Sequence, residues 1–239
     1  MSNEARYGKL IGIGVGPGDP ELLTVKAYRM LKETRVIAYP KKRKGEKSYA
    51  LSIVEQYVKA QEKEMVGLIF PMTRDPDVLS REWDQTVATV WSHLAQGKDV
   101  AFVTEGDPML YSTFIHLGRR MRKLHPQVEI MSIPGISSVN GAASRLHLPL
   151  ADGDEQVVIA PATADREAMR QVLQTHDAVV FLKVAKVLDL LLDILDELDL
   201  LDRAAVVSKV SSPEEQIWWD VRELRGKKLG YLSLMVVRK

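Results

Sequence analysis

The fold of this chain is most clearly indicated by the segment Gly12-Ile13-Gly14-Val15-Gly16-Pro17-Gly18-Asp19-Pro20. It follows the short apolar run Leu10-Ile11 and precedes a helix-like segment over 22–34. Glycine at alternate positions lets the backbone make turns that a Cβ would block, and lets a ligand approach the main chain closely. The segment therefore predicts a tight strand-to-helix turn, and it is also typical of a nucleotide-type cofactor site at the carboxyl end of a first strand.

The common phosphate-binding glycine motifs do not fit this segment. A dinucleotide fingerprint would need glycine at Pro17 or Asp19, and a P-loop would need Gly-Lys-Ser/Thr where the chain has Gly18-Asp19-Pro20. Proline also lacks the backbone N–H that a phosphate cradle uses. A Rossmann-type NAD(P) oxidoreductase, the alternative from a different class, would further need an acidic residue after a second strand, whereas Glu33 follows a helix-like segment. We therefore expect a ligand other than a pyrophosphate.

Composition bounds the class of protein. The chain has 239 residues, 46% of them hydrophobic, a formal net charge of +1 and no cysteine. Disulfides, thiolate metal sites and thiol nucleophiles are thereby excluded, and the five histidines show no metal-ligand spacing, so we expect no metal. The balanced charge predicts neither a nucleic-acid nor a membrane partner. The polar start of the chain, and the lack of an apolar run of about 20 residues, favour a cytoplasmic protein.

Short apolar runs alternate with helix-like segments through the first half of the chain, which predicts a mostly parallel α/β sheet with helices on both faces. The expected strands are 10–15, 36–39, 65–70, 100–104 and 128–133, and the expected helices are 22–34, 48–61, 78–96 and 113–124. The second half adds strands at 157–159, 178–182, 204–209, 215–220 and 229–237, and helices at 137–146, 164–175 and 184–201. Successive strands near the end indicate a mixed sheet. We expect two α/β domains, residues 1–135 and 136–239.

Two further loops follow strands of the first half. The loop Thr104 to Thr113 contains Gly106-Asp107-Pro108, in which Asp107 is either a turn or cap residue or a cofactor contact. The turn Pro134-Gly135-Ile136-Ser137-Ser138 opens a helix, where a serine is either an N-cap or a donor to a ligand. Loops after parallel strands meet at one edge of a sheet, so we expect all three to form one site.

Together, the loop Gly12 to Pro20, the Gly106-Asp107-Pro108 loop and the Pro134 to Ser138 turn resemble the tetrapyrrole methyltransferase family, which uses S-adenosyl-L-methionine. The motifs occur in the family's order over nearly the whole chain. Four further segments resemble the branch that methylates precorrin-2 or cobalt-factor II at carbon 20 in cobalamin (vitamin B12) biosynthesis: Gly16 to Ala27, Phe70 to Thr73, Gly106 to Phe114 and Tyr231 to Leu234. Other precorrins, uroporphyrinogen III, diphthine and ribosomal RNA are alternative substrates within the family.

The resemblance implies a homodimer of two-domain subunits with the cofactor in a cleft between the domains, and S-adenosyl-L-homocysteine as the product. It places these residues at the cofactor: Val15, Gly106, Asp107, Met109, Leu110, Tyr111, Ser137, Ser138, Leu182, Lys183, Val210 and Ser233. The second-domain positions depart from the family pattern, because Phe181-Leu182 stands where relatives often carry Tyr-Met, and Val210 where they often carry alanine.

A sulfonium methyl is already activated, so the main task of the protein is alignment and exclusion of water. Methylation at a meso carbon also releases a proton, for which Asp107, Tyr111 and Glu105 are acceptor candidates. The macrocyclic substrate carries eight carboxylates, which favours cationic neighbours. Lys183 and the segment Lys41-Lys42-Arg43-Lys44 are the cations we expect near it, although the latter is also typical of a solvated loop.

Overall fold

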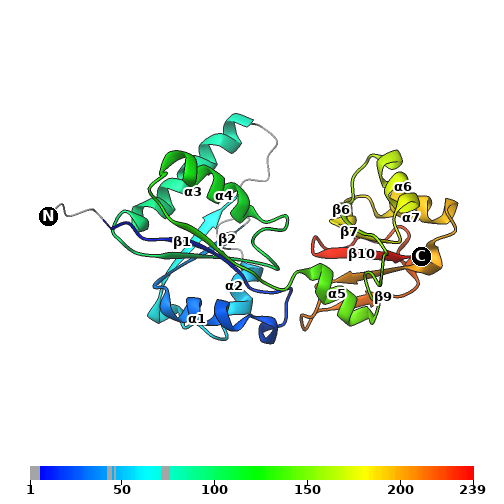
Figure 1. Ribbon diagram of the computed structural model, residues 1–239, viewed down its shortest axis with the longest axis horizontal. Helices are drawn as coiled ribbons and strands as arrows, with labels where there is room; N and C mark the ends of the chain where they lie inside the picture. Colours follow the sequence, from blue (N-terminus) through cyan, green and yellow to red (C-terminus); the bar gives the residue numbers. More distant parts are fainter. Residues whose placement is uncertain (1–5, 42–44, 46, 71–75) are drawn as a thin grey trace. The chain divides into compact units, whose positions relative to one another are not determined.

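The computed structural model describes residues 6–41, 45, 47–70 and 76–239, with the side chains of 76–79 left out of the description. It divides into two compact units, Met1–Ser137 and Ser138–Lys239 (Figure 1). Each unit contains one five-stranded sheet. The predicted fold class, two α/β units of which the first has a parallel and the second a mixed sheet, is confirmed.

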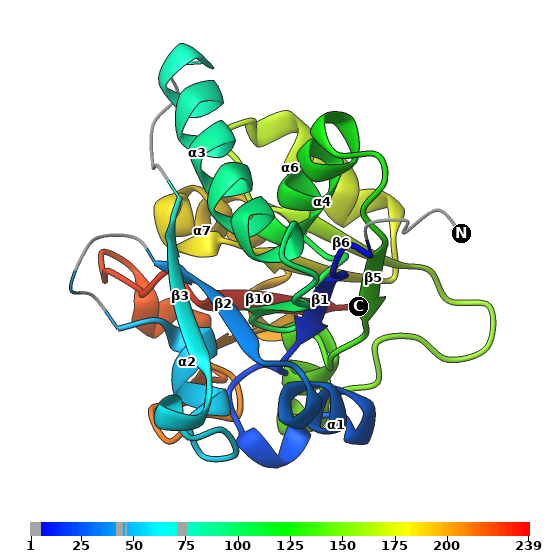
Figure 2. The same ribbon diagram turned by 90° about the vertical axis from the view of Figure 1, so that its left-hand side faces the viewer.

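The sheet of the first unit is parallel in every pairing, with strand order β3-β2-β4-β1-β5 (Figure 2). Its strands are β1 (Leu10–Gly14), β2 (Val36–Lys41), β3 (Glu64–Ile69), β4 (Val100–Thr104) and β5 (Ile130–Ile133). All residues of β1 and β4 are buried, which is typical of parallel strands covered by helices on both sides. The loops that follow β1, β4 and β5 leave the same edge of the sheet.

Helices cover both faces of this sheet, as the sequence predicts. On one face lie α3 (Pro76–Leu94) and α4 (Thr113–Leu124), and on the other α1 (Val25–Glu33) and α2 (Tyr49–Val54) (Figure 2). Each face has its own hydrophobic cluster: Phe102 packs with α3 and α4, and Ile13 packs with α1 and α2. A 3-10 turn, η1 (Pro20–Leu22), follows the glycine-rich segment and precedes α1.

The helix expected over 48–61 is shorter in the structure. Ser48 caps α2 by accepting a hydrogen bond from Leu51 N at 3.4 Å, and the helix ends at Val54. The amides of Tyr57 and Val58 both donate to the Val54 carbonyl, at 2.9 and 3.0 Å, which closes the helix in a turn. A second short 3-10 turn, η2 (Ala60–Glu62), then leads into β3.

The sheet of the second unit has strand order β6-β7-β10-β8-β9 and is mixed, as expected. Its strands are β6 (Val157–Pro161), β7 (Ala178–Leu182), β8 (Ala204–Ser208), β9 (Gln216–Trp218) and β10 (Ser233–Arg238). β6 and β7 are parallel, whereas β10 runs antiparallel to both β7 and β8. The carboxyl ends of β7 and β8 therefore lie beside the amino end of β10.

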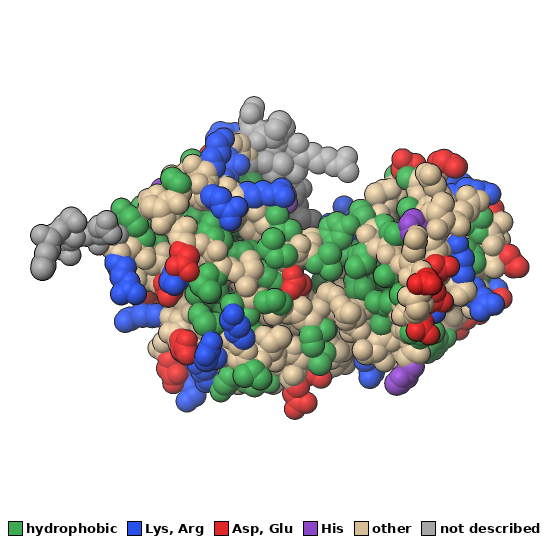
Figure 3. All heavy atoms as spheres, viewed as in Figure 1, with side chains coloured by type: hydrophobic (Ala, Val, Ile, Leu, Met, Phe, Trp, Pro, Cys, Tyr) green, Lys and Arg blue, Asp and Glu red, His purple; other side chains and the backbone are tan. Residues whose placement is uncertain are grey.

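Both charge signs are found on the face of each unit that Figure 3 shows. The space-filling view shows lysines and arginines interspersed with aspartates and glutamates on the visible face (Figure 3). Ion pairs between described residues include Arg120 with Asp84 at 2.7 Å in the first unit and Arg225 with Asp193 at 2.6 Å in the second. This distribution agrees with the net charge of +1.

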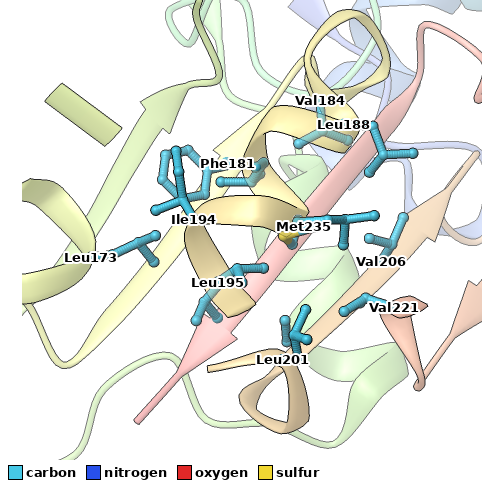
Figure 4. Packing of buried hydrophobic residues seen from close by; sticks show 14 of the residues in the cluster. Leu173, Phe181, Val184, Leu188, Ile194, Leu195, Leu201, Val206, Val221 and Met235 are labelled. Atoms are coloured by element: carbon cyan, nitrogen blue, oxygen red, sulfur yellow. The ribbon is translucent and has the colours of Figure 1, made fainter. Parts of the chain in front are cut away.

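One face of the second sheet carries the hydrophobic core of its unit. Two helices, α6 (Arg166–Thr175) and α7 (Leu188–Glu197), pack there, and the side chains of Ile194 and Leu195 lie over Phe181 and Met235 (Figure 4). A third helix, α5 (Ser138–Leu146), contacts β10. Three 3-10 turns complete the unit: η3 (Val184–Lys186), η4 (Leu201–Arg203) and η5 (Val221–Leu224).

Candidate cofactor site

Three glycines from separate loops meet at the carboxyl edge of the first sheet. A Cβ built on Gly14 would lie 2.5 Å from the carbonyl oxygen of Gly106 and 2.6 Å from the nitrogen of Gly135. A Cβ on Gly135 would lie only 2.2 Å from the same Gly106 oxygen. Real Cβ atoms do not approach other atoms so closely, so this backbone junction requires glycine at positions 14 and 135. The structure thus brings the three predicted loops together.

Backbone hydrogen bonds hold the first two of these loops to each other. Gly106 N donates to Gly16 O at 2.8 Å, and Gly16 N donates to Gly106 O at 3.4 Å, which forms an isolated antiparallel bridge. Both glycines have positive φ, 83° for Gly16 and 61° for Gly106. Between them in this arrangement, Val15 is fully buried and its N–H donates to Thr104 O at 3.0 Å. A cofactor contact at Val15 would therefore involve its main chain.

Asp107 joins the second loop to the third. Its Oδ1 accepts a hydrogen bond from Met109 N at 2.8 Å, and its Oδ2 accepts one from Gly135 N at 3.1 Å. Hydrogen bonds from amides to a carboxylate are stronger than neutral ones, so this side chain fixes the loop after β4 against the turn after β5. The sequence interpretation of Asp107 as a turn residue describes these contacts directly.

The rest of the second loop presents apolar side chains. Met109 is 59% exposed and Tyr111 46% exposed, while Leu110 between them is half-buried. Tyr111 has φ of +52°, a left-handed conformation that is uncommon for a residue with a side chain. Such a conformation persists where the surrounding structure determines it, and it often occurs at functional sites.

A buried hydroxyl pair closes this loop at its base. Thr104 Oγ1 and Ser112 Oγ lie 3.0 Å apart, and Ser112 Oγ accepts a hydrogen bond from Phe114 N at 3.1 Å as the N-cap of α4. Neither residue was among the site residues expected from the sequence. Ser112 could have been found from its position immediately before a predicted helix. The contact of Thr104 with Ser112 forms only because the loop after β4 folds back to the end of that strand.

Ser137 and Ser138 mark the passage from one unit to the other. Ser137 is the last residue of the first unit, and Ser138 is the first residue of α5. Both are half-buried. The turn before them is tied to the first unit, because the Thr24 hydroxyl lies 3.5 Å from the carbonyl oxygen of Pro134.

The second-unit residues expected at the cofactor share one edge of their own sheet. Leu182 ends β7 opposite Leu234, and Ser233 begins β10 opposite Ser208 at the end of β8. Lys183 follows β7 directly, and Val210 is the second residue after β8. The structure therefore brings Leu182, Lys183, Val210 and Ser233 to one place within the second unit.

The local environments of these four residues differ. Ser233 is buried, with its Oγ 2.8 Å from Gly230 O and 3.0 Å from Ser208 Oγ. Val210 is also buried, at 3% exposure. Lys183 is exposed and has φ of +61°. Its left-handed backbone sets the direction in which the chain leaves β7.

Part of the expected substrate surface lies outside the described residues. Lys42, Arg43 and Lys44 are in this category, as is the segment 71–73. Lys41 is described, with its ammonium 5.2 Å from the ring centroid of Tyr39. Within the described ranges, no group of three or more His, Cys, Asp or Glu side chains is arranged to hold a metal ion. Over the same ranges, no helix has the length and apolar character needed to cross a membrane.

Comparison with known proteins identifies the family. The family described as Tetrapyrrole (Corrin/Porphyrin) Methylases matches residues 9–225. The chain is 34% identical to the cobalt-precorrin-2 C(20)-methyltransferase of Salmonella typhimurium over 97% of each chain. It is 36% identical to the precorrin-2 C(20)-methyltransferase of a Sinorhizobium species, covering 84% of each chain.

Solved structures share the fold. A cobalt precorrin-4 methyltransferase superposes with a TM-score of 0.74 at 21% identity, covering 96% of this chain and 94% of that one. The uroporphyrin-III C-methyltransferase of Thermus thermophilus, complexed with S-adenosylhomocysteine, superposes with a TM-score of 0.67 at 21% identity, covering 97% and 98%. The oxidoreductase alternative is therefore wrong, and the chain belongs to the tetrapyrrole (corrin/porphyrin) methylases.

Proposed function

We propose that this chain transfers a methyl group from S-adenosyl-L-methionine to carbon 20 of precorrin-2 or cobalt-factor II, in cobalamin biosynthesis. The observation that carries the proposal is the junction of Gly14, Gly106 and Gly135, which joins three loops at the carboxyl edge of the first sheet. Relatives named for this reaction align with most of the chain, which supports the same assignment here.

The residues at the carboxyl edge of the first sheet, hereafter the first edge, suit such a cofactor. Met109 and Tyr111 expose large apolar surfaces beside a junction built from backbone, as a ligand with a flat apolar ring and polar ends requires. The solved relative complexed with S-adenosylhomocysteine gives further support. When bound, S-adenosylmethionine supplies a methyl group already activated by positive sulfur and leaves as S-adenosylhomocysteine.

The side chains of the second loop have different roles in this proposal. Asp107 holds the loop in shape through its two amide contacts, so that backbone groups and the side chains of Met109, Leu110 and Tyr111 face the ligand. Tyr111, exposed and held in a left-handed conformation, is the residue we propose to relay the proton that carbon 20 releases: its hydroxyl oxygen receives that proton as its own O–H proton passes to solvent. Asp107 stays a second candidate for that proton.

The carboxyl ends of β7 and β8 and the amino end of β10 form what we call the second edge. Its residues complete the proposed set of cofactor contacts. Leu182, Val210 and Ser233 are proposed to contact the cofactor, as are Ser137 and Ser138; the common edge of the first three supports this. The exposed Lys183 supplies a cation for the cofactor or for a substrate carboxylate. From the family resemblance we further propose a homodimer in the cytoplasm, which light scattering and cell fractionation would check.

An anaerobic methyl-transfer assay tests the function. Purified chain and labelled S-adenosylmethionine are offered precorrin-2, cobalt-factor II and uroporphyrinogen III in parallel, and products are located by mass spectrometry and NMR. One added methyl at carbon 20 of either of the first two is expected, and the preferred one assigns the metal state of the substrate. Transfer to uroporphyrinogen III alone, or at another carbon, would overturn the substrate while keeping the family.

A further inference from the structure

The loop after β8 in the second unit is held in an unusual backbone conformation. Lys209 and Ser211 have φ of +49° and +60°, and they flank the buried Val210. A left-handed conformation costs free energy for a residue with a Cβ, and it persists where neighbouring groups enforce it. Two such residues around one proposed cofactor contact indicate that something in the unit holds this loop.

Glu215 helps to hold it, beside the hydrogen bond from Lys209 N to Leu232 O at 2.8 Å. Its Oε1 accepts a hydrogen bond from the backbone N–H of Ser211 at 3.3 Å, the amide of one of the left-handed residues. Its side chain is only 9% exposed, and a carboxylate so buried needs a charged partner. Arg145 supplies that partner, with its Nε 2.9 Å from Oε1 and 2.6 Å from Oε2.

The pair links two segments that carry proposed cofactor contacts. Arg145 lies in the last turn of α5, the helix whose first residue is Ser138. Glu215 lies at the end of the loop that contains Val210. Because α5 is one continuous helix that begins at Ser138, the Arg145–Glu215 contact fixes the Val210 loop relative to this helix.

We propose that Arg145 and Glu215 are positioning residues, which hold the Val210 loop in the conformation that binds the cofactor. The inference rests on the proposed function, since it takes S-adenosylmethionine as the ligand. Neither side chain needs to touch that ligand. Their effect passes through the backbone of Ser211 to Val210, and so it falls on cofactor affinity rather than on the methyl-transfer step.

A second ion pair of the same unit provides a matched control. Arg170 on α6 and Glu197 on α7 lie 2.7 Å apart, with side chains 33% and 47% exposed. This pair joins two helices on the core face of the sheet and contacts none of the proposed cofactor residues. Glu197 keeps its other partner, Arg166, when Arg170 is replaced, so Arg170→Gln measures the loss of one arginine contact away from the proposed site.

Calorimetric titration with S-adenosylhomocysteine tests the proposal. We expect Glu215→Ala and Arg145→Gln to raise the Kd by about 10-fold, whereas Arg170→Gln changes it by less than about 2-fold. Glu215→Gln should fall between, because an amide oxygen can still accept from Ser211 N but does not pair ionically with Arg145. In steady state, the KM for S-adenosylmethionine should rise with kcat little changed.

A second-site variant separates positioning from general destabilisation. Glycine adopts positive φ without steric cost, so Ser211→Gly should restore most of the affinity lost in Glu215→Ala. No rescue, or equal affinities for Arg145→Gln and Arg170→Gln, would overturn the proposal. If Glu215→Ala does not fold, the comparison of Arg145→Gln with Arg170→Gln decides alone. No binding of S-adenosylhomocysteine by the unmodified chain would instead overturn the proposed function.

Discussion

The two sheet edges that carry the proposed cofactor contacts are held in different ways. At the first edge, backbone packs on backbone: a Cβ on Gly14 would lie 2.5 Å from Gly106 O, and one on Gly135 would lie 2.2 Å from it. At the second edge, side chains restrain non-glycine residues in left-handed conformations, as Glu215 does for Ser211. The first kind of contact dictates residue type and tolerates no substitution, whereas the second distributes the restraint over distant residues and responds gradually to their loss.

The largest expected effect comes from a side chain placed in the glycine junction. Gly135→Ala would put a Cβ 2.2 Å from Gly106 O, which the backbone must move to relieve. We expect the free energy of unfolding to fall by about 3 kcal/mol or more, and methyl transfer to be lost. Urea denaturation and the transfer assay measure the two effects.

Gly118→Ala in α4 is the matched control in the same unit. Its new Cβ would meet Ile130 at an ordinary 3.8 Å, and alanine is the better helix former. The free energy of unfolding should therefore rise by about 0.5–1 kcal/mol. Similar unfolding free energies for the two variants would contradict the description of the first edge.

The next effect concerns Asp107, the carboxylate that joins the loop after β4 to the turn after β5. Asp107→Ala removes two charge-assisted hydrogen bonds, to Met109 N and Gly135 N. We expect S-adenosylhomocysteine to bind about 10- to 100-fold more weakly. Calorimetry measures this loss. If Asp107→Asn instead left binding unchanged and abolished turnover, Asp107 would be the proton acceptor and its positioning role would be secondary.

Both edges contain a buried hydroxyl pair at 3.0 Å, Thr104 with Ser112 and Ser208 with Ser233. Ser112 is also the N-cap of α4, so Ser112→Ala should lower the free energy of unfolding by about 1–2 kcal/mol. Ser233→Ala should lower the free energy of unfolding by about 1 kcal/mol, because Ser233 makes hydrogen bonds but caps no helix. Thermal or urea unfolding checks the order, and a larger loss for Ser233→Ala would contradict it.

The smallest effect is a pH dependence away from the edges. A hydrogen bond from Lys98 in the first unit lowers the pKa of Glu64 below its ordinary value, with further lowering from the charges of Lys98, Arg35 and His93. In the second unit, hydrogen bonds from Arg238 and the Asp152 amide lower the pKa of Glu155. Each contribution is complete above the ordinary pKa of 4.5 and is lost as the pH falls through the lower folded value.

Stability should therefore decrease on acidification below about pH 4.5, and Glu64→Gln or Glu155→Gln should each make that decrease slightly shallower. The side chains of Glu64 and Glu155 are 32% and 35% exposed, and screening by solvent keeps the effect small. Urea denaturation at a series of pH values from neutral to acid measures the slopes. Identical slopes for variants and unmodified chain would show that these ion pairs do not couple to folding.

The same contrast between the edges explains what could be predicted from the sequence. Glycines and prolines at strand ends are local signals, so the three loops of the first unit and their meeting point follow from Gly14, Gly106 and Gly135. The parallel and mixed sheets follow from the order of apolar segments. The helix expected over 48–61 ends at Val54, because the amides of Tyr57 and Val58 both donate to the Val54 carbonyl. The spacing of apolar residues does not predict this turn.

The restraint of the second edge was beyond sequence reasoning. Arg145 and Glu215 are 70 residues apart and carry no motif, and a left-handed Ser211 has no compositional signal where glycine would have given one. Thr104 was missed at the first edge for a similar reason. Thr104 ends β4, and its hydroxyl partner, Ser112, lies at the far end of the loop that follows this strand. The Arg145–Glu215 and Thr104–Ser112 pairs form only when the folded chain brings their residues together, so no local segment of the sequence predicts them.

The most direct measurement is calorimetric titration of the unmodified chain with S-adenosylhomocysteine, repeated with Gly135→Ala and Glu215→Ala. We predict one molecule bound per chain, no detectable binding by Gly135→Ala, and binding weakened by about 10-fold in Glu215→Ala. This result would show that a rigid glycine edge and an adjustable side-chain edge both serve one cofactor. Absence of binding by the unmodified chain, or equal affinity in all three, would contradict the account.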